Sequence, residues 1–179
     1  DLRFAAFLNK TYLHYKSPIK SFLNEEMRER QNLSDCKAEE IKLNIHHLFF
    51  STDFTTYVRG GRVSKTMGLI GTILKICPIL YVNEVGKLVQ YKKVRTKSKA
   101  IVQIVKEMFL LINENSNYDN KCYISHSNSI DDAMAVKKEV EKMFPNLEGK
   151  VIINSIGTII GSHSGPGTVA LFFVGNKRS

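Results

Sequence analysis

Short apolar runs alternate with helical periods through most of the chain, and this alternation restricts the fold more than any other feature. Ile79–Val82, Cys122–Ile124 and Val151–Ile156 have the length and composition of short buried strands. Lys97–Asn113 has a 3.6-residue period that places its apolar side chains on one helix face. Strands that alternate with helices are typical of α/β folds. We therefore predict an α/β fold in which helices pack on a mixed β-sheet.

The remaining elements follow from caps, breaks and apolar patterns. Asn83–Gly86 has a turn composition and predicts a hairpin between the strands on either side of it. Ser129 is expected to cap a helix with Asp131 and Asp132 in its first turn, where the helix dipole favours acids. Further strands are predicted at 48–50, 88–94 and 169–174, and further helices at 34–45 and 67–76.

The chain divides into two parts of different character. Residues 1–32 are aromatic, basic and helix-prone, with a break at Ser17-Pro18. We interpret them as a helical segment of unclear assignment, which a remnant of a preceding domain would account for. Residues 33–179 have the length of one ordinary domain that needs no disulfide or metal to fold.

Cysteine usage and hydropathy limit the compartment. The three cysteines are scattered and make no metal-ligand spacing, which favours a reducing environment. The first residues do not have a signal-peptide pattern. The longest apolar run, Met67–Val82, is interrupted by Lys75 and Pro78 and is too short to span a bilayer. We predict a cytoplasmic protein.

The formal net charge is +9, and the basic residues are mostly spread along the chain, with one concentration. Lys87–Lys99 holds six basic residues and no acid. One interpretation is a solvated hairpin and helix start, and the other is a docking face for an acidic partner or an anionic membrane surface. Nucleic-acid binding would rest on charge alone, because no DNA- or RNA-binding motif is present.

A glycine-rich segment, Gly157–Thr168, lies between two predicted strands. We expect a tight turn at a sheet edge that carries His163 among hydroxyl groups. Glycines allow a ligand to approach the backbone closely, and the hydroxyls of Ser162, Ser164 and Thr168 are hydrogen-bond donors for an anion. The alternative is an ordinary turn whose histidine bonds the backbone.

Two further segments are candidates for ligand contact. In Tyr57–Ser64 a pair of glycines separates Arg59 from Arg62, so the bend could direct guanidinium groups to a small anion or could be an ordinary basic turn. The apolar stretch Gly68–Leu74 is explained by core packing, although its glycines leave space beside a helix for an alkyl chain. His46 and His47 are adjacent and would point to opposite faces of a strand, so we predict no metal site.

The arginine-containing and histidine-containing segments resemble the motifs of a known family. Tyr57–Ser64, continuing to Leu80, is similar to the central RGGR element of the DegV family, and Ile160–Gly167 is similar to its closing G-x-H-x-G-P-G motif. The resemblance covers about residues 34–179. It departs from the family at Ser162 and Ser164, where threonines are usual, and in the absence of a match for the amino-terminal DegV domain.

The resemblance implies a DegV-type carboxy-terminal lipid-binding domain over residues 33–179. Such a protein holds a long-chain fatty acid, needs no cofactor, and presents the carboxylate to a separate fatty acid kinase for acyl phosphate formation in phospholipid synthesis. It is a carrier and not an enzyme. The expected ligand-binding residues are His163, Arg62, Ser162, Ser164, Gly161, Gly165, Thr168, Leu69, Ile70 and Ile73. The alternatives are a small phosphotransferase or hydrolase with His163 as general base, and a basic nucleic-acid-binding module.

Overall fold

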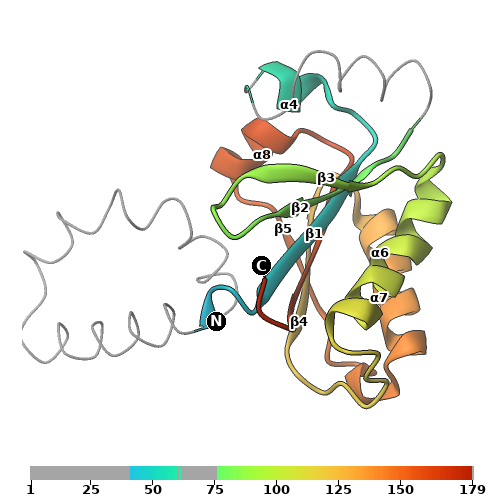
Figure 1. Cartoon of the computed structure of the whole chain (residues 1–179). Helices are drawn as coiled ribbons and strands as arrows, with labels where there is room; N and C mark the ends of the chain where they lie inside the picture. Colours follow the sequence, from blue (N-terminus) through green and yellow to red (C-terminus); the bar gives the residue numbers. More distant parts are fainter. Residues whose placement is uncertain (1–40, 60, 62–75, 179) are drawn as a thin grey trace, which may run out of the picture.

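A six-stranded sheet forms the centre of the protein (Figure 1). The structure is a computed structural model that describes residues 41–59, 61 and 76–178. The strands are β1 (Ile45–Ser51), β2 (Ile79–Val82), β3 (Leu88–Lys92), β4 (Cys122–Ser127), β5 (Ile152–Ser155) and β6 (Thr168–Val174). Their order across the sheet is β3-β2-β1-β6-β4-β5. The predicted mixed α/β architecture is confirmed, since β4 and β5 are parallel and the other pairs are antiparallel.

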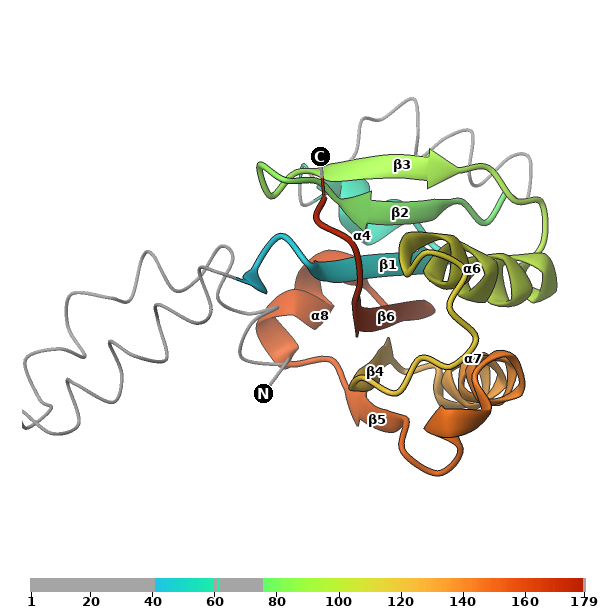
Figure 2. The same ribbon diagram turned by 60° about the horizontal axis from the view of Figure 1, so that its bottom comes forward.

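The two central strands, β1 and β6, come from opposite ends of the described chain (Figure 2). They pair along their whole length, from Ile45 opposite Val174 to Ser51 opposite Thr168. All seven residues of β1 are buried. A strand covered on both faces needs apolar side chains in both directions, which explains why β1 has no alternation of apolar and polar residues.

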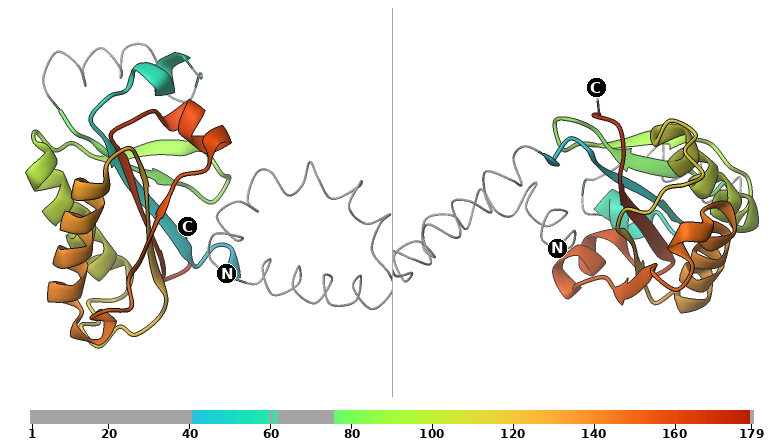
Figure 3. Two further views of the ribbon diagram at one scale, coloured as in Figure 1. Left: turned by 180° about the vertical axis from the view of Figure 1, so that it is seen from behind. Right: turned by 90° about the horizontal axis from the view of Figure 1, so that it is seen from below.

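Helices α6 (Lys97–Leu111) and α7 (Ile130–Met143) lie side by side against one face of the sheet (Figure 3). The main core lies between them and the strands, and a short 3₁₀ helix, η2 (Pro145–Leu147), closes its far end. Ile104 and Met108 of α6 and Val136 of α7 are fully buried there. Glu107 is also fully buried on α6.

The opposite face of the sheet carries a second, smaller apolar cluster. Phe49, Leu80 and Ala170 come from the strands, while Phe54 and Tyr57 come from the segment after β1. That segment forms a short helix, α4 (Thr55–Arg59), and a second short helix, α8 (Thr158–Ser164), packs against it. Both lie at the same end of the sheet (Figure 1).

The structure corrects several element boundaries. The predicted helix over 34–45 is wrong at its end, because Ile45 is the first residue of β1. The strand beginning at Cys122 continues to Ser127. Ser129 occupies the N-cap position of α7, but its side chain makes no cap hydrogen bond. The predicted helix over 67–76 and the segment 1–32 lie outside the described residues.

Candidate functional site

Helices α4 and α8 meet at one end of the sheet, although they are far apart in sequence. β1 ends at Ser51, directly opposite Thr168, where β6 begins. The chain leaving β1 enters α4, and the chain entering β6 comes from α8, so the pairing of the central strands brings these helices together. The described start of the arginine-containing segment, Tyr57–Arg59, therefore lies on the helix that contacts α8.

Two glycines allow the close approach of these segments. Gly165 and Gly167 have φ angles of 72° and 82°, a region that favours glycine. A Cβ added to Gly165 would lie 2.5 Å from Oγ1 of Thr56, on α4. A Cβ added to Gly167 would meet Oγ1 of Thr52 at least as closely. The positive φ angles and the lack of space for a Cβ atom therefore both require glycine at positions 165 and 167.

Buried hydroxyl groups join the two segments. The hydroxyls of Tyr57 and Thr168 are 3.2 Å apart, and Thr168 Oγ1 donates to the carbonyl of Ser164 at 2.9 Å. Burial raises the pKa of Tyr57 to about 12, so this hydroxyl is neutral near pH 7. Ser164 is also buried, and its Oγ has no hydrogen-bond partner within the described ranges. An unpaired buried hydroxyl is uncommon in native structures and costs stability.

His163 lies in the last turn of α8 and is half-buried. No acidic side chain in the described part of the chain forms a hydrogen bond or ion pair with it, so nothing there orients it as a general base. Ser162 is exposed, and its Oγ donates to the carbonyl of Ile159 at 2.7 Å. Ser162 therefore bonds its own helix, whereas the Ser164 hydroxyl has no such bond among the described residues.

The structure places the predicted site residues in two groups. Those on α8 and the turn after it lie together beside α4: Gly161, Ser162, His163, Ser164, Gly165 and Thr168. Those before β2 lie outside the described residues: Arg62, Leu69, Ile70 and Ile73. The predicted tight turn at a sheet edge is wrong, because Thr158–Ser164 is helical and β6 is a central strand. Gly157 and Gly165 flank this helix, Gly161 lies within it, and Gly167 follows it.

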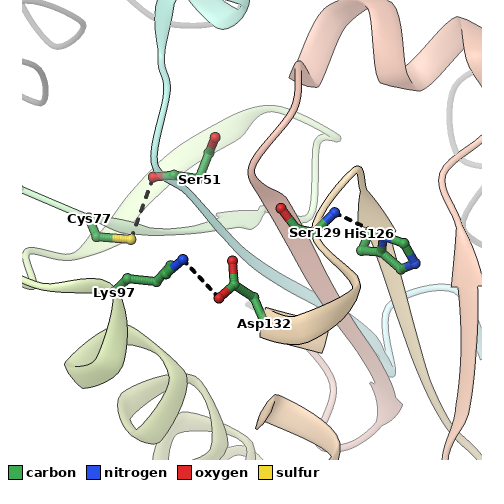
Figure 4. Close-up of polar contacts among 6 residues, drawn as sticks. All are labelled: Ser51, Cys77, Lys97, His126, Ser129 and Asp132. Atoms are coloured by element: carbon green, nitrogen blue, oxygen red, sulfur yellow. Dashed lines mark hydrogen bonds and ion pairs between the residues drawn. The ribbon is translucent and has the colours of Figure 1, made fainter. Parts of the chain in front are cut away.

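A polar cluster supports the same end of the sheet from the opposite face (Figure 4). Lys97 at the start of α6 pairs with Asp132 in the first turn of α7 at 2.9 Å. The thiol of Cys77 is 3.5 Å from the carbonyl of Ser51, and burial raises its pKa to about 12, so it is not a reactive thiolate. The backbone N–H of Ser129 donates to Nδ1 of His126.

The two histidines of β1 pack against aromatic side chains of β6. His46 stacks on Phe173 and His47 meets Phe172 edge-on, so the two rings lie on opposite faces of β1. Burial lowers the pKa of His46 and lowers that of His47 to about 3. Among the described residues, no group of three or more His, Cys, Asp or Glu side chains could hold a metal ion. Within the same residues, no helix is long and apolar enough to cross a bilayer.

The predicted basic segment forms a groove between β3 and α6. Its volume is about 600 Å³, and it is lined by Lys92, Lys93, Val94, Arg95, Ser98, Lys99, Val102, Gln103 and Lys106. Two of the lining residues contact buried Glu107: Lys92 forms an ion pair with it and Gln103 donates a hydrogen bond to it. Oε2 of Glu107 is buried and has no hydrogen-bond partner within the described ranges.

Several residues of these sites were missed from the sequence. Thr52 and Thr56 were not considered, although they form the surface on which the glycines pack. The sequence signal for them is Asp53, whose carboxylate accepts from the N–H of Thr55 at 2.8 Å and marks a helix start directly after a buried strand. Glu107 was hidden within the apolar period of α6, where an acid is normally read as solvent-facing.

Known proteins are similar to this chain in sequence and in fold. The model of a family described as "Uncharacterised protein, DegV family" matches residues 35–176. A DegV domain-containing protein of Clostridium perfringens is 33% identical over 142 residues, which are 79% of this chain and 47% of that protein. The chain thus spans about half the length of this relative.

Solved structures agree with these sequence matches. The crystal structure of a fatty-acid-binding DegV family protein from Streptococcus agalactiae is 28% identical, with a TM-score of 0.67 over 84% of this chain and 53% of that one. The Fatty Acid Kinase (Fak) B3 protein of Streptococcus pneumoniae, loaded with linoleic acid, has the same fold at 16% identity, with a TM-score of 0.67 over 79% of this chain and 48% of that one. Because the family model matches most of its length, this chain belongs to the DegV family.

Proposed function

We propose that this chain is the lipid-binding half of a cytoplasmic fatty-acid carrier and that the carboxylate of the fatty acid binds where α8 meets α4. The observation that carries the proposal is the buried hydroxyl of Ser164, unpaired among the described residues, beside half-buried His163. Membership of the DegV family supports it, as does the S. agalactiae relative, which is a fatty-acid-binding protein.

The chemistry of the site suits a carboxylate. A carboxylate that leaves water needs hydrogen-bond donors, because an unpaired buried charge costs several kcal/mol. His163 can donate one hydrogen bond from its ring, and Ser164 can donate another once α8 adjusts to the ligand. Arg62 is proposed as a third, cationic contact that follows α4 in sequence. Neither α4 nor α8 contains an acidic residue that would repel the ligand.

The alkyl chain needs an apolar surface next to these donors. Ile159 and Ile160 of α8 are 62% and 49% exposed, so they are available for contact. Phe172 is half-buried on the sheet face that α4 covers. Each methylene buried contributes about 0.8 kcal/mol. Leu69, Ile70 and Ile73 are proposed as the further apolar wall.

We assign no catalytic step to this chain. A carrier needs only to hold the acid with its carboxylate accessible, and a separate fatty acid kinase then transfers a phosphoryl group to it for phospholipid synthesis. The shared fold of the Fak B3 protein supports this role. The alternative of His163 as a general base lacks an orienting acid within the described residues, and the nucleic-acid alternative rests on net charge alone.

Acid and ester ligands distinguish carboxylate binding from a bracing role of His163. Titration of a fluorescent fatty acid against His163→Ala should show binding weaker by about 1.5–3 kcal/mol, the value of a hydrogen bond to a charged group. The methyl ester should lose much less, since it carries no charge. Ser98→Ala is the matched control, because this exposed hydroxyl is on α6, on the other face of the sheet, and it should leave both affinities unchanged. Equal losses for acid and ester would refute the assignment.

Native mass spectrometry of the purified chain tests lipid binding without a chosen ligand. The expected result is a copurified fatty acid at low occupancy, because the matched relatives are about twice as long as this chain and offer further walls for the ligand. The S. agalactiae protein, purified in parallel, should carry more lipid. Equal occupancy in both would assign the entire binding site to this half.

A further inference from the structure

The groove between β3 and α6 contains cations that the fold does not use. Lys92 is bound to Glu107, and this contact raises the pKa of Lys92. Lys92 therefore has a structural role. Lys93, Arg95, Lys99 and Lys106 are exposed and form no ion pair with any acid in the described part of the chain. Four like charges around one depression repel each other, so an anionic occupant would relieve that repulsion.

The position of the groove relates it to the fatty-acid site. Lys92 pairs with Ile79, Ile79 with Phe50, and Phe50 with Val169, which follows Thr168. These residues form one row across four neighbouring strands. Three steps between strands correspond to about 15 Å. This is the separation within the plane of the sheet. The groove faces α6 and the carboxylate site faces α4, so a partner bound in the groove would reach the carboxylate around this end of the sheet.

The lining of the groove favours a protein segment over a membrane. The groove is concave, whereas a bilayer presents a broad surface that contacts protruding side chains. Val94 and Val102 line it among the basic residues, and Val102 is 40% exposed. Alternating acidic and apolar side chains would satisfy both kinds of lining at once, as in acidic segments that dock on basic grooves.

We propose that this groove docks an acidic, partly apolar segment of the partner protein that acts on the carboxylate of the bound fatty acid. The identity of that partner rests on the proposed function, but the recognition chemistry rests on the groove alone. Lys93, Arg95 and Lys99 bind the acidic side chains, and Val94 and Val102 contact the apolar ones. Glu107 holds Lys92 beside them and fixes the shape of the groove.

Fluorescence anisotropy with a short synthetic peptide of alternating glutamate and leucine tests the groove. The chain should bind this peptide, and affinity should fall steeply as salt is raised. The triple variant Lys93→Glu, Arg95→Glu, Lys99→Glu should bind at least about tenfold more weakly, and the corresponding triple glutamine variant should lose less. A matched control reverses Lys138, Lys142 and Lys150, which lie on and after α7 toward its distant carboxyl end, and it should stay within about twofold of the unaltered chain.

Two further measurements distinguish peptide docking from a lipid surface and from a general effect of net charge. Sedimentation with vesicles of phosphatidylcholine and phosphatidylglycerol should be unaffected by the groove substitutions; loss of vesicle binding without loss of peptide binding would assign the groove to a lipid surface. Equal losses in the groove variant and the control would reduce the effect to net charge and overturn the proposal, as would no peptide binding by the unaltered chain. Fatty-acid titration of the same variants is independent, so a failure to bind lipid would count against the proposed function only.

Discussion

Helices α6 and α8 lie on opposite faces of the same sheet, and different forces hold them (Figure 3). α6 has fifteen residues and buries Ala100, Ile104, Val105, Glu107 and Met108, and α8 has seven residues and buries only Ser164. Thr96 caps α6 through its side chain, while Gly157 at the start of α8 makes no such bond. α6 is stabilised by its apolar face, whereas α8 is stabilised by the turn that follows it and by its contact with α4.

Core truncation should separate the two helices by the largest amount. Ile104→Ala in α6 removes a fully buried side chain and should lower the free energy of unfolding by about 2–5 kcal/mol. Ile160→Ala in α8 removes a side chain that is 49% exposed and should change it by less than about 0.5 kcal/mol. Urea unfolding measures both. Similar losses would mean that α8 is held by burial after all.

Replacing a glycine next to α8 should destabilise the protein far more than truncating an exposed side chain of α8. Gly165→Ala combines a positive φ with contact to Thr56, so we expect a loss of about 2–4 kcal/mol. Gly149→Ala is the matched control, because Gly149 has a similar φ of 71° but no atom within 4 Å of an added Cβ. It should lose only about 1 kcal/mol from backbone strain. Thr56→Gly should restore part of the loss at Gly165, and a failure to do so would remove the steric explanation.

The hydroxyl pair between α4 and the start of β6 should have a smaller effect. Tyr57→Phe removes the hydrogen bond to Thr168 and should lower the free energy of unfolding by about 0.5–1.5 kcal/mol. Tyr123→Phe serves as the control, because Tyr123 is also buried and its hydroxyl forms no hydrogen bond within the described ranges. Thermal unfolding compares the two variants. An equal loss would show that the Tyr57 hydroxyl contributes nothing specific.

Exchanging the N-cap residues of α6 and α8 should give the smallest changes in the free energy of unfolding, a loss for α6 and a gain for α8. Thr96→Gly removes the oxygen that accepts from the N–H of Lys99 and should lose a few tenths of a kcal/mol, roughly the difference between these residues at an N-cap. Gly157→Thr supplies such an oxygen to α8, whose N-cap backbone is already extended, and should gain about as much. Protection of α8 amides in hydrogen exchange would measure the gain. No change would mean that α8 does not depend on its own first turn.

The difference between α6, which is stabilised by its own apolar face, and α8, which depends on distant contacts, explains what the sequence could predict. α6 was predicted because Ile104 and Met108 belong to a long apolar period, and the strands were predicted because their cores are β-branched or aromatic. α8 was predicted as a turn because Gly157, Gly161 and Gly165 are poor helix formers and its length gives no period to detect. Its helical form depends on neighbours far away in the chain, and Thr56 is the clearest of them.

The candidate site at α4 and α8 was predicted only where the local sequence was enough. His163 and Ser164 were identified from motif chemistry, which needs only the local sequence. The contact with Tyr57 was not, because it depends on the pairing of β1 with β6. The groove was predicted as a basic segment but not as a depression, since its other wall is α6, and the packing of α6 beside β3 is not visible in the sequence.

The central position of β1 and β6 has a consequence for how the protein acquires its fold. During synthesis β1 emerges before every other described strand, and β6 emerges after them all. The strongly apolar β1 therefore waits for its principal partner while β2, β3, β4 and both long helices are made. Contacts so distant in sequence are slow to close, and the intermediate has an unpaired apolar strand edge. We expect refolding to be slow and sensitive to protein concentration, with chaperones binding the nascent chain until β6 leaves the ribosome.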